Sequence, residues 1–307
     1  MPAGAATAPL TGLVIDPPLA VFRPALAVKV DNLDIPGETA RPQAGIADAD
    51  VVIEEIVEGG ITRLVAVFQS AIPERVGPVR SARTTDPKLL AQLNRPLFAW
   101  SGGNGTVVGA VRGGGEVRDF GWDAQPAAYG RDRSRRGPHD LFVVPGKLFE
   151  AAPSDAGAPP EIFRYRDTGE KLLPTAKPAR GVRLDFGSGS ASPDVQFEYD
   201  PNVDGWRRGQ NGTTHVDDKG QVVAPTNVVV LFTDYVTSPA DPISPEAVST
   251  GSGQAWVFSK GRVIGGTWER AAVNDRCILK DAQGTEIKLT RGRTWVELPK
   301  PGGATIL

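Results

Sequence analysis

Charged side chains gather between residues 54 and 83, beside two short apolar segments of the chain. The segments 51–57 and 64–68 are rich in β-branched residues, which predicts two buried strands. Six charged residues fall at or near the ends of these strands: Glu54, Glu55, Glu58, Arg63, Arg80 and Arg83. Charges at such positions either pair with one another or face a ligand. The sequence is therefore compatible with a structural ion-pair network and with a binding or catalytic cleft.

The neighbouring acids Glu54 and Glu55 could serve acid–base chemistry, because alternation along a strand places them on opposite faces. One acid can then be buried with a raised pKa while another stays ionised, which is the asymmetry that glycoside cleavage needs. The catalytic hypothesis uses Glu55 or Glu58 as the acid/base and His139, next to Asp140, as an assisting residue. Alternatively, His139 fixes the loop that carries it.

The histidine count argues against a metal site. The chain has two His, and one falls in each half, at His139 and His215. A zinc site would need both of them and a carboxylate, so no metal is expected. His215 follows Asn211-Gly212, which predicts an ordinary exposed hairpin. Residues 102–105 are Gly-rich but lack the Lys-Ser/Thr of a P-loop and the full dinucleotide fingerprint, so no nucleotide cofactor is expected either.

The arginines suggest an anion-binding surface. The basic run 131–136 predicts a solvated loop. Together with the strand-end arginines it could instead line an anion-accepting groove, since guanidinium groups match the oxygens of carboxylates and phosphates. The candidate ligand-binding residues are Arg63, Arg80, Ser81, Arg83, Arg136 and Asp140. We expect the main members of both hypotheses to converge in space, namely Glu58, Arg63, Arg80, Arg83 and His139.

Composition narrows the class of protein. A net charge of -2 gives no electrostatic reason to expect nucleic acid or an anionic membrane surface as a partner. The chain has one Cys, Cys277, so it cannot form an intramolecular disulfide. Because Cys277 lies in an apolar alternating segment, we expect it to be buried and inert. No apolar run approaches the length of about 18 residues that a membrane-spanning helix requires.

The pattern of predicted secondary structure changes near the middle of the chain. Up to about residue 153, predicted strands alternate with predicted helices, of which residues 86–93 carry the clearest start signal, Asp86-Pro87. Residues 152–161 are rich in Pro, Ala and Gly, and beyond them short strands alternate with turns. We therefore predict an α+β protein: a flexible tether at 1–18, an α/β layered domain with a mixed sheet at 19–153, and a mostly antiparallel β domain at 154–307. Residues 102–129 are expected to form an irregular flap.

Several ordered segments resemble those of a known family. In the first half these are PLTGL (9–13), ALAVKVDN (25–32), ARPQAGI (40–46), the strand pair with its arginines (51–83) and RGPHDL (136–141). In the second half they are DGWRR (204–208), HVD (215–217), NVVV (227–230) and GRTWV (292–296). This pattern is similar to the YerB-like lipoprotein family, which is built on the N- and C-terminal domains of a domain of unknown function numbered 3048. The resemblance implies a membrane-anchored, extracytoplasmic envelope protein whose signal and lipid-anchor Cys lie upstream of this chain.

These observations lead to one main functional hypothesis and two alternatives. The main hypothesis is a binding module for a cell-wall polymer, such as the glycan or peptide of peptidoglycan. The first alternative is a wall-active hydrolase or lyase that uses Glu55 or Glu58 with His139. The second is a protein–protein scaffold in an envelope complex. Turnover of purified wall material would separate the first two.

Overall fold

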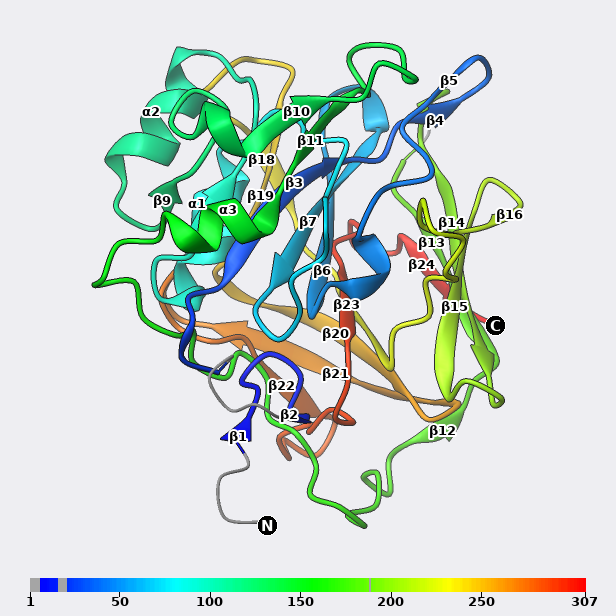
Figure 1. Ribbon diagram of the computed structural model, residues 1–307. Coiled ribbons are helices and arrows are strands. Elements are labelled where there is room, and N and C mark those ends of the chain that lie inside the picture. The colour runs from blue at the N-terminus through cyan, green and yellow to red at the C-terminus, as the bar shows by residue number, and fades with distance from the viewer. Residues whose placement is uncertain (1–5, 16–20, 188) are drawn as a thin grey trace.

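One large mixed sheet forms the centre of the protein. The computed structural model describes residues 6–15, 21–187 and 189–307. Eleven strands of this part form the central sheet, in the order β12-β21-β20-β17-β23-β6-β7-β3-β8-β9, with β22 paired to β21. A second, five-stranded sheet has the order β16-β15-β14-β13-β24 and covers one face of the central sheet, on which α3 also packs, while α1 and α2 pack on the other face (Figure 1). Strands predominate and helices are few, which fits the predicted α+β class.

The elements have the following bounds. The helices are η2 Ile46–Asp48, η3 Glu58–Gly60, α1 Thr85–Leu90, η4 Ala91–Leu93, α2 Gly105–Gly113, η5 Pro126–Ala128 and α3 Pro145–Glu150. The strands of the first half are β1 Ala6–Thr7, β2 Val14–Ile15, β3 Leu26–Asp31, β4 Asp34–Ile35, β5 Glu38–Thr39, β6 Val51–Ile56, β7 Thr62–Phe68, β8 Leu97–Ala99, β9 Arg118–Asp119, β10 Tyr129–Arg131 and β11 Leu141–Val143. Those of the second half are β12 Lys177–Pro178, β13 Gly181–Asp185, β14 Asp194–Asp200, β15 Gly205–Gln210, β16 Thr213–Thr214, β17 Asn227–Leu231, β18 Tyr235–Thr237, β19 Pro245–Ala247, β20 Gly251–Ser259, β21 Arg262–Arg270, β22 Ile278–Asp281, β23 Thr294–Glu297 and β24 Ala304–Ile306.

The central strands β3, β6 and β7 are buried along their whole length. This explains their nearly continuous apolar sequence, because both faces of this part of the sheet are covered. One face packs against residues of the second sheet such as Phe197 and Trp206. The other packs against α1 and α2 through residues such as Leu90 and Val107. Charged residues within these strands are therefore buried on one face or the other.

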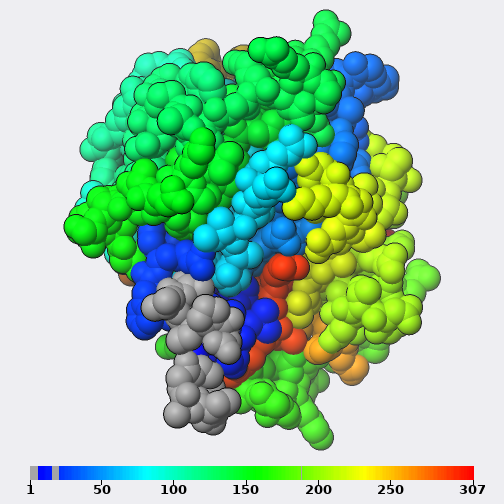
Figure 2. All heavy atoms as spheres, in the orientation of Figure 1, coloured from blue at the N-terminus to red at the C-terminus, as the bar shows by residue number. Residues whose placement is uncertain are grey.

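The two halves share the central sheet. Strand β23 pairs in parallel with β6, from Thr294 opposite Val51 to Glu297 opposite Glu54, and β17 pairs in parallel with β23. The expectation that residues 152–161 separate two independently compact units is therefore wrong. The physical reason is the edge of β6, whose backbone groups would be left unpaired if the first half stood alone. On the surface, segments around residues 75 and 218 also meet (Figure 2), where Arg75 pairs with Asp218 at 2.9 Å.

Residues 6–15 are packed rather than forming part of a free tether. Strands β1 and β2 pair with each other, and Leu10 is fully buried. The carbonyl of Thr11 accepts a hydrogen bond from the Gly292 amide at 2.7 Å. The rest of the expected tether, 1–5 and 16–18, lies outside the described residues. Within the described ranges, no helix is long and apolar enough to cross a membrane.

Two helix expectations need correction. Asp86 lies inside the first turn of α1 rather than at its N-cap, which is Thr84, because its carboxylate binds Lys29 and the Arg83 amide instead. The expected flap at 102–129 contains the regular helix α2. The Asn104 side chain caps this helix by accepting a hydrogen bond from the Val107 amide at 3.1 Å.

Candidate functional site

Glu54 and Glu55 point to opposite faces of β6, as alternation predicts, but both are fully buried. Lys29, on β3, donates to Asp86 at 2.7 Å and also contacts Glu55, and all three side chains are inaccessible to solvent. Burial raises the pKa of Glu55, and the neighbouring Lys29 opposes that rise. A substrate therefore has no access to Glu55, and its arrangement is that of a structural ion-pair network.

Arg63 is the most unusual member of the cluster of strand-end charges, which comprises Glu54, Glu55, Glu58, Arg63, Arg80 and Arg83. In the strand register it lies opposite Glu55 of β6 and opposite Asp31 of β3. Its side chain donates to the Ser81 carbonyl at 3.0 Å, yet among the described residues no carboxylate lies within 4.0 Å of it and its buried Nε has no partner. Burial, together with the positive charges of Arg83 and Arg80, lowers its pKa to about 10. Arg63 is thus a buried cation without a direct counter-ion.

Arg83 links Arg63 to Glu58. The Arg83 Nε donates to Glu58 at 3.0 Å, and its guanidinium also reaches the Ala82 carbonyl at 2.7 Å and the Ser81 carbonyl at 3.5 Å. Arg63 and Arg83 therefore share the Ser81 carbonyl as an acceptor. Burial alone would raise the pKa of Glu58, but hydrogen bonds from Arg83 and Ser244 outweigh it and hold that pKa below its ordinary value. Glu58 is an ionised partner of Arg83 and is poorly suited to act as an acid.

His139 lies between two carboxylates. Its Nδ1 is 2.7 Å from Asp31, which also pairs with Arg80 at 2.9 Å, and its Nε2 is 3.0 Å from Glu38 of β5. The hydrogen bond with Asp31 raises the pKa of His139 despite partial burial. Both ring nitrogens of His139 are engaged. We therefore infer that His139 links β3 to β5, as a clamp between them, rather than transferring a proton to a substrate.

The structure brings together five of the predicted residues through a chain of contacts. Glu58 contacts Arg83, which shares an acceptor with Arg63, and Arg80 and His139 share Asp31, the residue opposite Arg63. Two candidates lie apart from this chain. Asp140 pairs with Arg131 at 2.7 Å. Arg136 is exposed and makes no side-chain hydrogen bond or ion pair with the described residues.

Lys29, Asp31 and Asp86 complete the cluster but were not identified from the sequence. A signal was present for two of them, because Lys29 and Asp31 interrupt the apolar strand LAVKVD. A charge in the middle of a buried strand must find a partner. Asp86 carried no such signal, since Asp before Pro reads first as a helix cap.

A second buried network lies on the opposite face of β6. Arg208 of β15 donates to Glu54 at 2.7 Å and to Nδ1 of His215 at 2.8 Å, while Nε2 of His215 is 2.8 Å from Gln43. Burial, followed by the charge of Arg208, lowers the pKa of His215 well below its ordinary value. The expectation of an exposed hairpin histidine is wrong, because the first half of the chain covers this hairpin. Within the described residues, no cluster of three His, Cys, Asp or Glu side chains could hold a metal ion.

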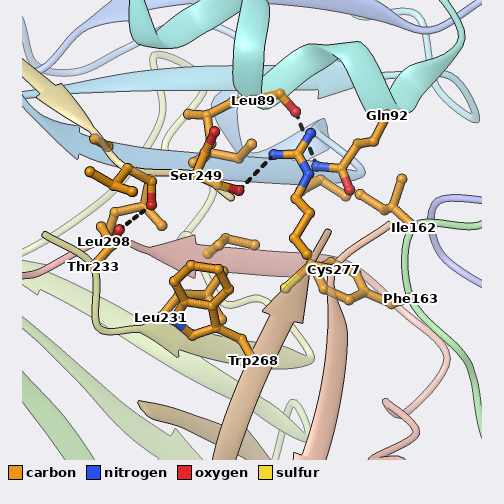
Figure 3. A pocket seen from close by; sticks show the side chains of 16 residues that line it. Leu89, Gln92, Ile162, Phe163, Leu231, Thr233, Ser249, Trp268, Cys277 and Leu298 are labelled. Atoms are coloured by element: carbon orange, nitrogen blue, oxygen red, sulfur yellow. Dashed lines mark hydrogen bonds between the residues drawn. The ribbon is translucent and has the colours of Figure 1, made fainter. Parts of the chain in front are cut away.

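An apolar cavity of about 40 Å³ lies between η4 and the central sheet (Figure 3). Leu89, Trp268 and Cys277 are among the residues that line it. An engineered apolar cavity that admits benzene measures about 150 Å³, so this one is too small for a ligand of that size. Burial raises the pKa of Cys277 to about 12, which agrees with the prediction that this residue is buried.

Comparisons with known proteins place the chain in a family. The model described as "Protein of unknown function (DUF3048) N-terminal domain" matches residues 10–158, and that of the DUF3048 C-terminal domain matches residues 182–296. The chain belongs to the DUF3048 family. This member is 30% identical to the "Putative lipoprotein YerB" of Bacillus subtilis (strain 168) over 95% of this chain and 85% of that protein. The crystal structure of YerB protein from Bacillus subtilis has a TM-score of 0.85 and 26% identity, and the match covers 98% of this chain and 99% of that one.

Proposed function

We propose that this protein is an extracytoplasmic, lipoprotein-type envelope protein that binds an anionic cell-wall polymer such as peptidoglycan. The lipoprotein name of its B. subtilis relative supports the location. The contact surface would be formed by Arg80 and Arg83, whose side chains are 25% and 13% exposed, with Arg63 beneath them. Peptidoglycan peptides carry carboxylates, which guanidinium groups bind bidentately.

The observation that carries this proposal is the unpaired charge of Arg63. Arg80 pairs directly with Asp31 and Arg83 with Glu58, whereas Arg63 has no carboxylate within 4.0 Å among the described residues. The carboxylates of Glu55 and Asp86 do not supply this partner, because they are sealed in the interior and both pair with Lys29. A buried cation is costly unless it is paired, and a bound anion would supply the missing charge.

Hydrolysis is less well supported by the same geometry. Each candidate catalytic side chain already has a partner: Glu55 has Lys29, Glu58 has Arg83, and His139 has both Asp31 and Glu38. A general acid must reach the leaving-group oxygen, and Glu55 has no exposed surface. The contacts therefore favour binding over turnover.

A sedimentation assay with purified sacculi tests the proposal. The wild-type protein should co-sediment, and added salt should reduce the bound fraction, because exposed ion contacts are screened beyond about 8 Å at physiological ionic strength. The double variant Arg80→Ala/Arg83→Ala should bind at least about tenfold more weakly, the equivalent of about 1.4 kcal/mol. Arg164→Ala is the matched control, since this arginine is exposed and pairs with the exposed Glu161.

Three outcomes would point elsewhere. Release of soluble fragments from the sacculi by the wild-type protein would favour the hydrolase alternative. Neither binding nor release would favour a protein scaffold. Unfolding of the double variant, measured by thermal melting, would show that the arginines are structural, because breaking a buried pair costs about 3–5 kcal/mol.

A further inference from the structure

A loop of the second half of the chain reaches the arginine cluster of the first half, which consists of Arg63, Arg80 and Arg83. Residues 238–244, here called the strap, connect β18 to β19. The strap is closed on itself by hydrogen bonds from the Ser238 amide to the Ser244 carbonyl and from the Ser244 amide to Asp241, each 2.8 Å long. It crosses near the N-termini of α1 and α2, on the face of the central sheet that these two helices cover (Figure 1).

The strap contacts the cluster at Glu58. The Ser244 hydroxyl lies 2.5 Å from Asp241 and also contacts Glu58, the residue that pairs with Arg83. The hydrogen bond from Ser244 and, to a smaller extent, the positive charge of Arg83 hold the pKa of Asp241 below its ordinary value. Asp241, Ser244 and Glu58 thus form a chain of acid and hydroxyl groups that ends on the guanidinium of Arg83.

Two further polar contacts hold the strap in this position. Asn104, the N-cap of α2, donates to the Ala240 carbonyl at 2.9 Å, and the hydroxyls of Thr84 and Ser238 are 2.8 Å apart. The apolar side chains of the strap contribute little: Ile243 is 78% exposed, and Ala240 is a small, partly buried side chain that packs against the core. The strap is therefore attached mainly through polar groups that a charged ligand or water can replace.

We propose that the strap is a built-in competitor for the arginine site: it keeps Glu58 and Asp241 at Arg83 until a carboxylate of the ligand displaces them. This inference rests on the proposed function, since it concerns the regulation of the same site. It also specifies the ligand chemistry. The groups that now occupy the neighbourhood of Arg83 are carboxylates with an adjacent hydroxyl, so the preferred ligand is an acidic group of this kind, as in an acidic wall peptide.

A reversible disulfide tests this without changing any charge. The hydroxyls of Thr84 and Ser238 are 2.8 Å apart and both residues are buried, so Thr84→Cys/Ser238→Cys places two thiols close enough to bridge. Cys277 is buried and does not compete. Binding of a tetraglutamate peptide and of sacculi is measured with the oxidised and the reduced protein. We expect the oxidised form to bind at least about tenfold more weakly and reduction to restore binding.

Two single variants give an independent readout if the bridge fails to form. Ser244→Ala removes the hydroxyl that ties the strap to Glu58 and changes no charge, so affinity should rise about two- to tenfold, the equivalent of one hydrogen bond. Asp241→Asn should raise it further. Asp155→Asn is the matched control for charge, because this exposed acid pairs with Arg118 far from the strap in sequence.

The possible failures are distinguishable. Equal binding by the oxidised and reduced forms, or no gain with Ser244→Ala, overturns the role of the strap and leaves the proposed function intact. An equal gain with Asp155→Asn and Asp241→Asn shows a general charge effect and also overturns the inference. No binding of sacculi or peptide by the reduced protein overturns the proposed function and the strap with it.

Discussion

The carboxyl groups of Glu54 and Glu297 face each other on the adjacent parallel strands β6 and β23, and both are fully buried. Glu54 is paired with Arg208 at 2.7 Å, whereas Glu297 has no cationic side chain within 4.0 Å among the described residues. Burial, followed by the charge of Glu54, raises the pKa of Glu297 well above its ordinary value. Two carboxyls in this position cannot both be ionised at low cost, so Glu297 is the neutral one.

Replacing Glu297 by Gln should stabilise the protein at neutral pH. A carboxyl with a raised pKa in the folded state favours folding most below its unfolded pKa, and this contribution is lost as the pH rises above about 4.3. Gln keeps a neutral side chain at every pH. Urea unfolding between pH 4 and 8 should show that the advantage of the variant grows with pH. The same pH dependence in both proteins would contradict the assignment of Glu297 as neutral.

Arg208 should be essential for the junction between the halves. Arg208→Met leaves Glu54 buried without its ion pair, which we expect to cost about 3–5 kcal/mol in the free energy of unfolding. The double variant Glu54→Gln/Arg208→Met should recover a large part of that loss, because no unpaired charge remains. Equilibrium urea unfolding measures both values. If the double variant were as unstable as the single one, packing of Arg208 would matter more than its charge.

The pKa values of the two histidines should be shifted in opposite directions. The pKa of His139 is raised by Asp31 and Glu38, with Arg80 opposing, so its stabilising contribution is present below about 6.5 and is lost as the pH rises through the raised value. His215 is buried beside Arg208 and should stay neutral through the same range. Imidazole NMR signals followed from pH 5 to 9 would show this directly. A titration of His139 below pH 6.5 would refute the clamp between the two carboxylates.

Cys277 should resist thiol reagents in the native protein. With a pKa of about 12 caused by burial, only about one thiol in ten thousand is ionised at pH 8, and the sulfur is inaccessible as well. Labelling should be slow under native conditions and fast in concentrated urea. Rapid labelling of the native form would mean that the cavity lined by Cys277 opens readily.

Local sequence patterns predict the strands and the placement of Glu54 and Glu55 on opposite faces of β6, because period-2 alternation determines which face a side chain occupies. They did not predict the partners of Lys29 or the burial of His215. Those depend on contacts between residues far apart in sequence, such as Lys29 with Asp86 and His215 with Gln43. The turn at Asn211-Gly212 was predicted as a hairpin, and both residues have positive φ, but a turn signal says nothing about what covers the hairpin.

The parallel pairing of β23 with β6 also has a consequence for the order of folding. During synthesis the first half emerges early, with β6 already flanked by β7 on one side. Its other edge stays open until residues 294–297, almost the end of the chain, arrive. Contacts of such long sequence separation form late and slowly, and an unpaired apolar edge invites intermolecular pairing in the meantime. The newly made chain therefore exposes this edge until β23 pairs with it, and a truncation that removes β23 exposes the edge permanently.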